Sequence, residues 1–232
     1  MSEIDTRPPQ IAETYDDMYR SGGHEGVYAL PYRRSRYYPL FRAVLAELRR
    51  RDARDVLEVG CGVGTFASLL FDRTAIGYRG FDFSPVAVET AIARTGRKDA
   101  FRVGDATREE SYAQPYGTIV CTEVLEHIEA DRRAVALWRA GADCICSVPN
   151  FDSATHVRFF TSEAELWQRY GDLIDIRSIR RIKLPALTDL SWQSYLRALR
   201  WNRYRPKRLL DIMGLSDFDS GGWFLFAGTR RG

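Results

Sequence analysis

Residues 56–64 read VLEVGCGVG, and this stretch decides the fold of the 232-residue chain. A short apolar run that ends at glycine is typical of a buried strand. The three glycines permit both a sharp turn and a close approach of the backbone to a ligand. Residues 65–71 then read as a helix. The stretch therefore predicts a strand, a ligand-binding turn and a helix in direct succession.

Outward from this stretch, apolar runs alternate with segments of helical period. Ser84 and Pro85 supply an N-cap and a first-turn proline to a helix at 86–95. Further helices are expected near 130–140 and at 163–170. Such alternation predicts a doubly wound, Rossmann-like α/β fold, with a seven-stranded, mostly parallel sheet and helices on both faces. The expected strands cover residues 55–60, 76–83, 100–106, 117–123, 142–150, 174–184 and 223–231.

Two segments stand outside this alternation. Residues 1–54 are expected to form an N-terminal helical cap, with helices at 11–20 and 35–51, in front of the main domain at 55–232. Residues 185–222 interrupt the pattern before the last strand. This insertion is interpreted as a lid, a substrate wall or a contact of a homodimer.

Composition limits the class of protein. With 34 basic and 31 acidic residues the net charge is +3, which does not demand a polyanionic partner. The four cysteines form no CxxC pair, so we expect buried, reduced thiols rather than zinc. The chain has no signal-peptide pattern and no apolar run approaching the roughly 20 residues that cross a bilayer. A cytoplasmic protein without a membrane partner is expected.

The glycine spacing separates two kinds of nucleotide site. The dinucleotide pattern GxGxxG would require glycine at position 65, which is Thr65. The glycines instead stand at 60, 62 and 64, and the first of them follows Glu58 by two residues. This E-x-G-x-G-x-G pattern resembles motif I of the class I methyltransferases, and the resemblance implies S-adenosylmethionine as cofactor and S-adenosylhomocysteine as product.

Acidic residues at later strand ends extend the predicted cofactor site. Asp82 closes the second strand, where a carboxylate can accept two hydrogen bonds from a ribose diol. The family resemblance implies that Phe83 packs on adenine. It also implies that a leading helix covers the cofactor, a role open to Tyr15, Tyr19, Tyr28 and Tyr32; packing residues are the alternative for each of these tyrosines. The predicted cofactor residues are Tyr15, Glu58, Gly60, Gly62, Gly64, Asp82, Phe83, Asp105, Ala106, Thr122 and Glu123.

Methyl transfer to a hydroxyl requires alignment of the acceptor and removal of its proton. Histidine is the natural base near neutral pH. His127 follows the fourth strand and His156 the fifth, so both are expected at one edge of the sheet as catalytic residues. Capping or interfacial histidines are the alternative interpretation.

A metal site is a further interpretation of the same loops. Glu123, Glu126, His127 and His156 resemble the metal-binding set of the small-RNA 2′-O-methyltransferases. Two carboxylates and two imidazoles can hold Mg²⁺ or a softer divalent ion, which would polarise a diol. EVLEH also occurs in metal-free relatives, so the need for a metal stays open here.

The acceptor is the least determined element. Residues 28–41 and 147–166 resemble methyltransferases of bacterial glycan and secondary-metabolite pathways, among them the sugar 1-O-methyltransferases of mycobacterial methylmannose polysaccharide synthesis. The resemblance implies a saccharide or small-molecule acceptor. Nucleic-acid methylation is the alternative, and a non-catalytic binding protein a third. A sugar-stacking wall would use Trp192, Tyr195, Trp201, Tyr204 and Trp223, for which the core or a dimer contact is the alternative. An RNA patch would use Arg197, Arg200, Arg203, Arg205, Lys207 and Arg208 beside Trp201 and Tyr204, for which a solvated helix face is the alternative.

Overall fold

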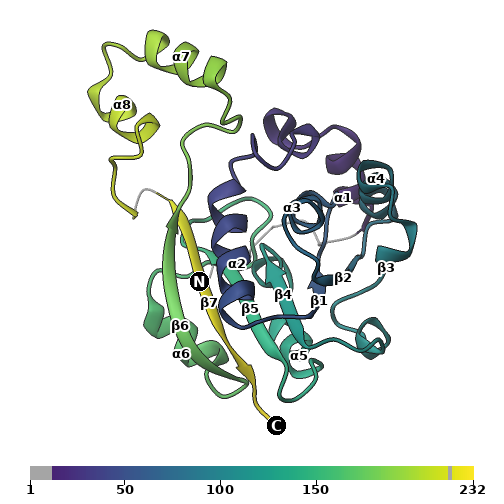
Figure 1. The fold of residues 1–232 in the computed structure, drawn as a ribbon. Coiled ribbons are helices and arrows are strands. Elements are labelled where there is room, and N and C mark those ends of the chain that lie inside the picture. The colour runs from purple at the N-terminus through teal and green to yellow at the C-terminus, as the bar shows by residue number, and fades with distance from the viewer. Residues whose placement is uncertain (1–11, 219–220) are drawn as a thin grey trace, which may run out of the picture.

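The computed structural model describes residues 12–218 and 221–232 and confirms the predicted fold class. Its seven-stranded sheet has the order β3-β2-β1-β4-β5-β7-β6 (Figure 1). The first five strands run parallel, and β7 runs antiparallel to both β5 and β6. The strands are β1 (Asp55–Val59), β2 (Gly77–Asp82), β3 (Phe101–Val103), β4 (Thr118–Thr122), β5 (Asp143–Pro149), β6 (Ile174–Lys183) and β7 (Gly222–Arg230).

Helices cover both faces of the sheet, as buried parallel strands require. Apolar residues of α2, α3 and α4 share one core cluster with β1, and residues of α5 and α6 share a second with β4 and β5. The order of elements matches the predicted alternation, except that α8 was not expected. The helices are α1 (Ala12–Arg20), α2 (Tyr38–Arg50), α3 (Thr65–Arg73), α4 (Pro85–Thr95), α5 (Asp131–Ala136), α6 (Glu163–Tyr170), α7 (Trp192–Trp201) and α8 (Pro206–Ile212).

The turn between β1 and α3 needs its glycines for two physical reasons. Gly60, Gly62 and Gly64 have φ values of 69°, 48° and 71°, in the left-handed region that side chains disfavour. A Cβ atom at Gly60 would lie 2.3 Å from the Cγ2 atom of Val124. The turn is thus both left-handed and closely packed, and it opens at the carboxyl edge of the sheet.

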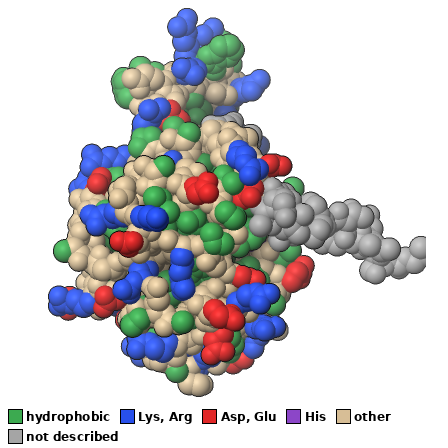
Figure 2. Space-filling model, turned by 90° about the vertical axis from the view of Figure 1, so that its right-hand side faces the viewer, with side chains coloured by type: hydrophobic (Ala, Val, Ile, Leu, Met, Phe, Trp, Pro, Cys, Tyr) green, Lys and Arg blue, Asp and Glu red, His purple; other side chains and the backbone are tan. Residues whose placement is uncertain are grey.

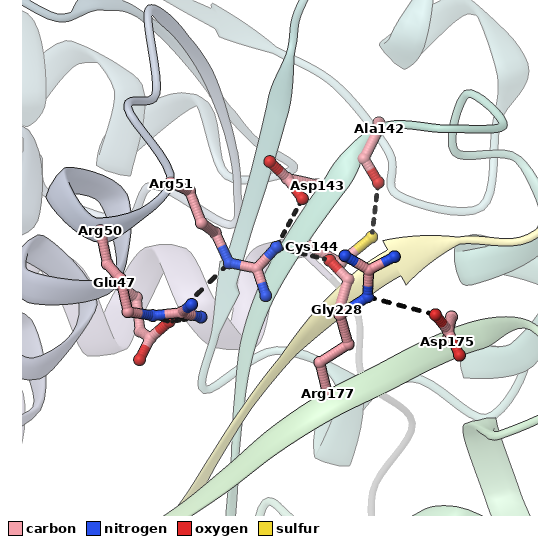
Figure 3. Close-up of polar contacts among 9 residues, drawn as sticks. All are labelled: Glu47, Arg50, Arg51, Ala142, Asp143, Cys144, Asp175, Arg177 and Gly228. Carbon is pink, nitrogen blue, oxygen red and sulfur yellow. Dashed lines mark hydrogen bonds and ion pairs between the residues drawn. The ribbon is translucent and has the colours of Figure 1, made fainter.

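A buried arginine fixes α2 across the sheet (Figure 3). Arg51 follows the last residue of α2, and its guanidinium donates to the carboxylate of Asp143 and to the carbonyl oxygen of Gly228. Its Nε atom lies 3.8 Å from a carboxylate oxygen of Glu47. Because Asp143 belongs to β5 and Gly228 to β7, one side chain holds the helix and two strands together.

The predicted insertion lies between β6 and β7, where α7 and α8 stand out from the body of the molecule (Figure 1). Its base is held to the segment before α2 by an ion pair of 2.7 Å between Arg34 and Asp189. Arg36 also donates to the carbonyl oxygen of Pro185 at 3.1 Å. In the register of β5 and β7, Pro149 lies opposite Trp223, so the insertion rises from the carboxyl edge of the parallel strands.

No helix among the described residues is both long and apolar enough to reach across a lipid bilayer. All four cysteines are buried and free, and burial raises the pKa of each thiol. They are therefore structural, poorly reactive thiols.

Candidate active site

Asp82 connects the glycine turn with the start of α4. Its carboxylate is 3% exposed and accepts the backbone N–H groups of Gly62 at 2.9 Å and Ser84 at 3.0 Å. Burial raises the pKa of Asp82 to about 6, although these hydrogen bonds act in the opposite direction. Each carboxylate oxygen has a second lone pair, so the group can still accept hydroxyls of a ligand seated on the turn.

Glu58 is as deeply buried as Asp82, with 3% of its surface exposed. The hydroxyl of Tyr78 donates to its carboxylate, and Tyr78 belongs to the core beneath α2–α4. Burial raises the pKa of Glu58 to about 8. Its carboxyl group is thus engaged in the interface between sheet and helices, and its contact with the cofactor stays a prediction.

The loop after β3 places Asp105 and Ala106 at the same edge. Asp105 is half exposed and accepts the backbone N–H and the hydroxyl of Thr107, each at 2.8 Å. The carbonyl oxygen of Ala106 accepts the hydroxyl of Tyr112 at 2.8 Å. Both residues are therefore held by local hydrogen bonds at the rim of the site.

Glu123, directly after the buried Thr122, has a left-handed backbone with φ of 58°, which is uncommon for a residue other than glycine. Ser147 holds it there by accepting its N–H at 3.2 Å and donating to its carboxylate at 3.0 Å. Burial raises the pKa of Glu123 to about 7. The indole of Trp223 lowers this pKa somewhat but makes no hydrogen bond of ordinary geometry.

Three predicted residues meet in one group. One potential ligand atom each of Glu126, His127 and His156 lies within 4.8 Å of the other two. The Nδ1 atom of His127 is 2.8 Å from the carbonyl oxygen of Thr155, and that of His156 is 3.2 Å from the carbonyl oxygen of Phe151. Because a carbonyl can only accept, each Nδ1 carries the proton and each Nε2 keeps its lone pair.

Glu126 makes this group suited to a cation. Its side chain is fully buried, and neither carboxylate oxygen has a hydrogen-bond partner. Burial and the neighbouring charge of Glu123 raise the pKa of Glu126 well above its usual range. An unsatisfied buried carboxylate beside two imidazoles is the donor set of a divalent transition-metal site. Glu123, the fourth predicted ligand, does not belong to this group, and one of its carboxylate oxygens accepts the hydroxyl of Ser147.

Arg158 is a positioning residue that the sequence did not indicate. Its guanidinium donates to the carbonyl oxygens of Leu125 at 2.7 Å and Ile128 at 2.5 Å. The backbone N–H of Val157 donates to the carbonyl oxygen of Glu126 at 2.8 Å. These bonds join the loop of Glu126 and His127 to the loop of His156.

The helix α1 packs against this group of residues, and its role as a cap over the cofactor stays a prediction. The ring of Tyr15 lies edge-on to Phe83, with centroids 4.9 Å apart, and also to His127 at 5.9 Å. Tyr19 and Tyr28 pack together beside it, with centroids 5.0 Å apart. Tyr15 therefore connects the predicted adenine side of the site to the histidine cluster.

Two aromatic residues follow the packing alternative and not a role in the site. Tyr32 donates to a carboxylate oxygen of Asp72 at 2.9 Å, within the core on the α2 side, and does not join the cap. Trp223 is fully buried in β7 and cannot form part of a sugar-stacking wall. A cavity of about 800 Å³ opens at the amino-terminal edge of β1 and β2, near Gly77 and Arg97. It therefore lies at the opposite edge of the sheet from the predicted site residues.

A family model described as a methyltransferase domain matches residues 32–194. The chain belongs to the methyltransferase domain family. It is an S-adenosylmethionine-dependent methyltransferase of class I. The matched range contains the glycine turn, Asp82 and the Glu126, His127 and His156 cluster.

Solved structures share the fold of this methyltransferase. The [4+2]-cyclase SpnF is 17% identical with a TM-score of 0.60, and the match covers 97% of this chain and 98% of that one. A Haemonchus contortus phosphoethanolamine N-methyltransferase 2, bound to S-adenosylhomocysteine, is 14% identical with a TM-score of 0.59, and the match covers 94% of this chain and 60% of that one. The methyltransferase domain of bacterial Hen1 is 16% identical with a TM-score of 0.53, and the match covers 84% of this chain and 99% of that one. At these identities the likeness concerns the fold, which hosts different chemistries.

Proposed function

We propose that this methyltransferase transfers the methyl group to a hydroxyl of a saccharide. The observation that carries the proposal is the cluster of Glu126, His127 and His156 next to Tyr15, on the cofactor edge of the sheet. A hydroxyl is a poor nucleophile until its proton is removed, so an O-methyltransferase needs a group that activates it. The cluster supplies one at the required edge.

The chain offers a cradle that fits the cofactor. The backbone of the glycine turn would contact the cofactor, Asp82 would accept hydrogen bonds from the ribose hydroxyls, and Phe83 would pack on adenine. When bound, S-adenosylmethionine supplies a methyl group already activated by a sulfonium charge. Burial raises the pKa of Glu123, and the positive charge of a bound cofactor would offset this effect by stabilising the ionised carboxylate. A raised pKa at this position therefore fits the proposed cradle.

The cluster would activate the acceptor as a metal site. Glu126, His127 and His156 would hold a divalent ion, which lowers the pKa of a coordinated hydroxyl. Burial lowers the pKa of His127 to about 4, so this imidazole alone is a weak base for an alcohol. One carboxylate with two imidazoles suits Mn²⁺, Fe²⁺ or Zn²⁺ better than Mg²⁺, which prefers oxygen ligands.

A 2′-hydroxyl of RNA is the second candidate acceptor. It is favoured by the resemblance of Glu123, Glu126, His127 and His156 to the metal-binding set of the small-RNA 2′-O-methyltransferases, three of which lie together in the structure. The saccharide proposal is supported by the resemblance of residues 28–41 and 147–166 to glycan-pathway enzymes. Both acceptors offer a sugar diol, so the cluster suits either one. Transfer of an isotope-labelled methyl group to a panel of glycosides and short RNAs would separate them.

Metal titration tests the activation step. We expect calorimetry with Mn²⁺ or Zn²⁺ to show about one site per chain, and chelation to reduce methyl transfer by at least ~10²-fold. Glu126→Gln should remove binding, because it deletes the carboxylate that the ion needs. Glu129→Gln alters an exposed acid three residues away and should bind normally. Unchanged turnover in excess chelator would contradict the metal assignment.

A further inference from the structure

The insertion concentrates the exposed apolar surface of the described residues. Of eleven large apolar side chains that are exposed, eight lie between residues 192 and 215. Trp192, Trp201 and Tyr204 are 71%, 80% and 83% exposed. No residue of α7 is buried, although Trp192, Leu196 and Leu199 form a stripe along it. Such a surface is costly in water and indicates that something covers it.

The same segment carries the excess of positive over negative charge in this chain. Residues 190–216 carry six cations and one acid, Asp211, which is a net charge of +5. The whole chain carries +3, so the remainder is −2. No ion pair is found for these six cations within residues 12–218 and 221–232. Figure 2 shows basic and hydrophobic side chains together on the protruding part. The cations are Arg197, Arg200, Arg203, Arg205, Lys207 and Arg208.

We propose that α7 and α8 dock the enzyme on the surface of an anionic lipid bilayer. Interfacial helices of this kind combine Trp and Leu with a row of Lys and Arg, and anionic headgroups attract the basic side chains. The apolar residues would enter the boundary of headgroups and acyl chains without crossing the membrane. This inference does not depend on the proposed acceptor, and it replaces the sequence-based expectation of no membrane partner.

Two features of the patch favour a bilayer over other partners. RNA would pair with the arginines and stack on Trp201 and Tyr204, but it gives no reason to expose Leu196, Leu210 and Met213. A second copy of the chain in a two-fold contact would place +5 against +5. A lipid surface satisfies the aliphatic side chains and the cations together.

The attachment of the insertion would orient the enzyme. The Arg34–Asp189 ion pair and the bridge between Ser35 and Asp189 hold its base to the body. Because β7 begins at the carboxyl edge of the sheet, docking through α7 and α8 would turn the cofactor edge toward the lipid surface.

Vesicle flotation of the full-length protein tests the proposal. Binding should be strong to phosphatidylcholine mixed with phosphatidylglycerol, weak to pure phosphatidylcholine, and reduced by salt. Arg200→Gln with Arg203→Gln should weaken partitioning roughly 20- to 30-fold, at about fivefold for each cation. Trp192→Ala with Trp201→Ala should weaken it at every salt concentration, because it removes apolar contacts.

Trp167→Ala is the matched control, since Trp167 is an exposed tryptophan on α6, outside the insertion. It should float like the unmodified protein. Equal recovery with and without anionic vesicles would overturn the proposal, as would salt-dependent binding of a random RNA by a protein that ignores vesicles. Self-association that the tryptophan substitutions abolish, without vesicle binding, would assign the surface to a second copy instead.

Discussion

At the scale of single residues, the site is defined by buried carboxyl groups. Asp82, Glu123 and Glu126 all have raised pKa values because burial penalises their charged forms. Such groups cost folding free energy unless a ligand compensates them. Glu126 is the extreme case, since neither of its oxygens has a hydrogen-bond partner.

Glu126→Met should therefore stabilise the metal-free protein. Methionine fills a similar volume and removes an unsatisfied polar group, so we expect the free energy of unfolding to rise by about 1–2 kcal/mol. Urea unfolding in the presence of chelator measures this. The variant should also lose any shift of the melting temperature on addition of Mn²⁺. A marked loss of stability in chelator would show that the carboxyl group has a structural partner, and would weaken the case for a cation.

At the scale of elements, one buried aspartate joins α5 to α6. Asp131 accepts Arg169 at 2.6 and 2.7 Å and the hydroxyl of Tyr170 at 2.6 Å. It also lies 3.4 Å from Arg158, the residue that joins the loop of Glu126 and His127 to the loop of His156. Burial alone would raise the pKa of Asp131, but the bonds from Arg169 and Tyr170 together with the Arg158 charge lower it.

The sign of this shift gives a pH prediction. A lowered folded-state pKa contributes stability that is fully present above the unfolded value of about 4, and that is lost as the pH falls through the folded value. Asp131→Asn should cost about 3 kcal/mol near neutral pH, and its stability should fall less steeply below pH ~4. Unfolding in urea at several pH values checks both effects.

Asp172→Asn is the control for this prediction, because Asp172 pairs with Arg132 at 2.6 Å on the exposed surface. We expect it to cost less than about 1 kcal/mol at any pH. Equal costs for the two substitutions would show that burial adds nothing to the Asp131 network.

At the scale of the whole molecule, the predictable parts are those with a local signal. Hydrophobic period and glycine spacing placed the seven strands, because most strands carry an apolar run and β6 alternates apolar with polar residues. The helix α8 has only seven residues and buries only Ile212, so it is too short to show an apolar period in the sequence. Arg158 escaped prediction because it bonds to backbone carbonyls, which have no sequence signature. The sequence left the position of Trp223 open between a stacking wall and the core, because an aromatic residue at a strand end suits both.

Every proposed role of the site depends on the cofactor cradle, and calorimetric titration with S-adenosylmethionine tests this cradle most directly. The unmodified protein should bind the cofactor, and Asp82→Ala should weaken binding by about 1–3 kcal/mol, the scale of a lost hydrogen bond involving a charged group. A melting curve would confirm that the variant is folded. Unchanged affinity in the folded variant, or uptake of NAD in place of S-adenosylmethionine by the unmodified protein, would contradict the placement of the cofactor on Asp82 and the glycine turn.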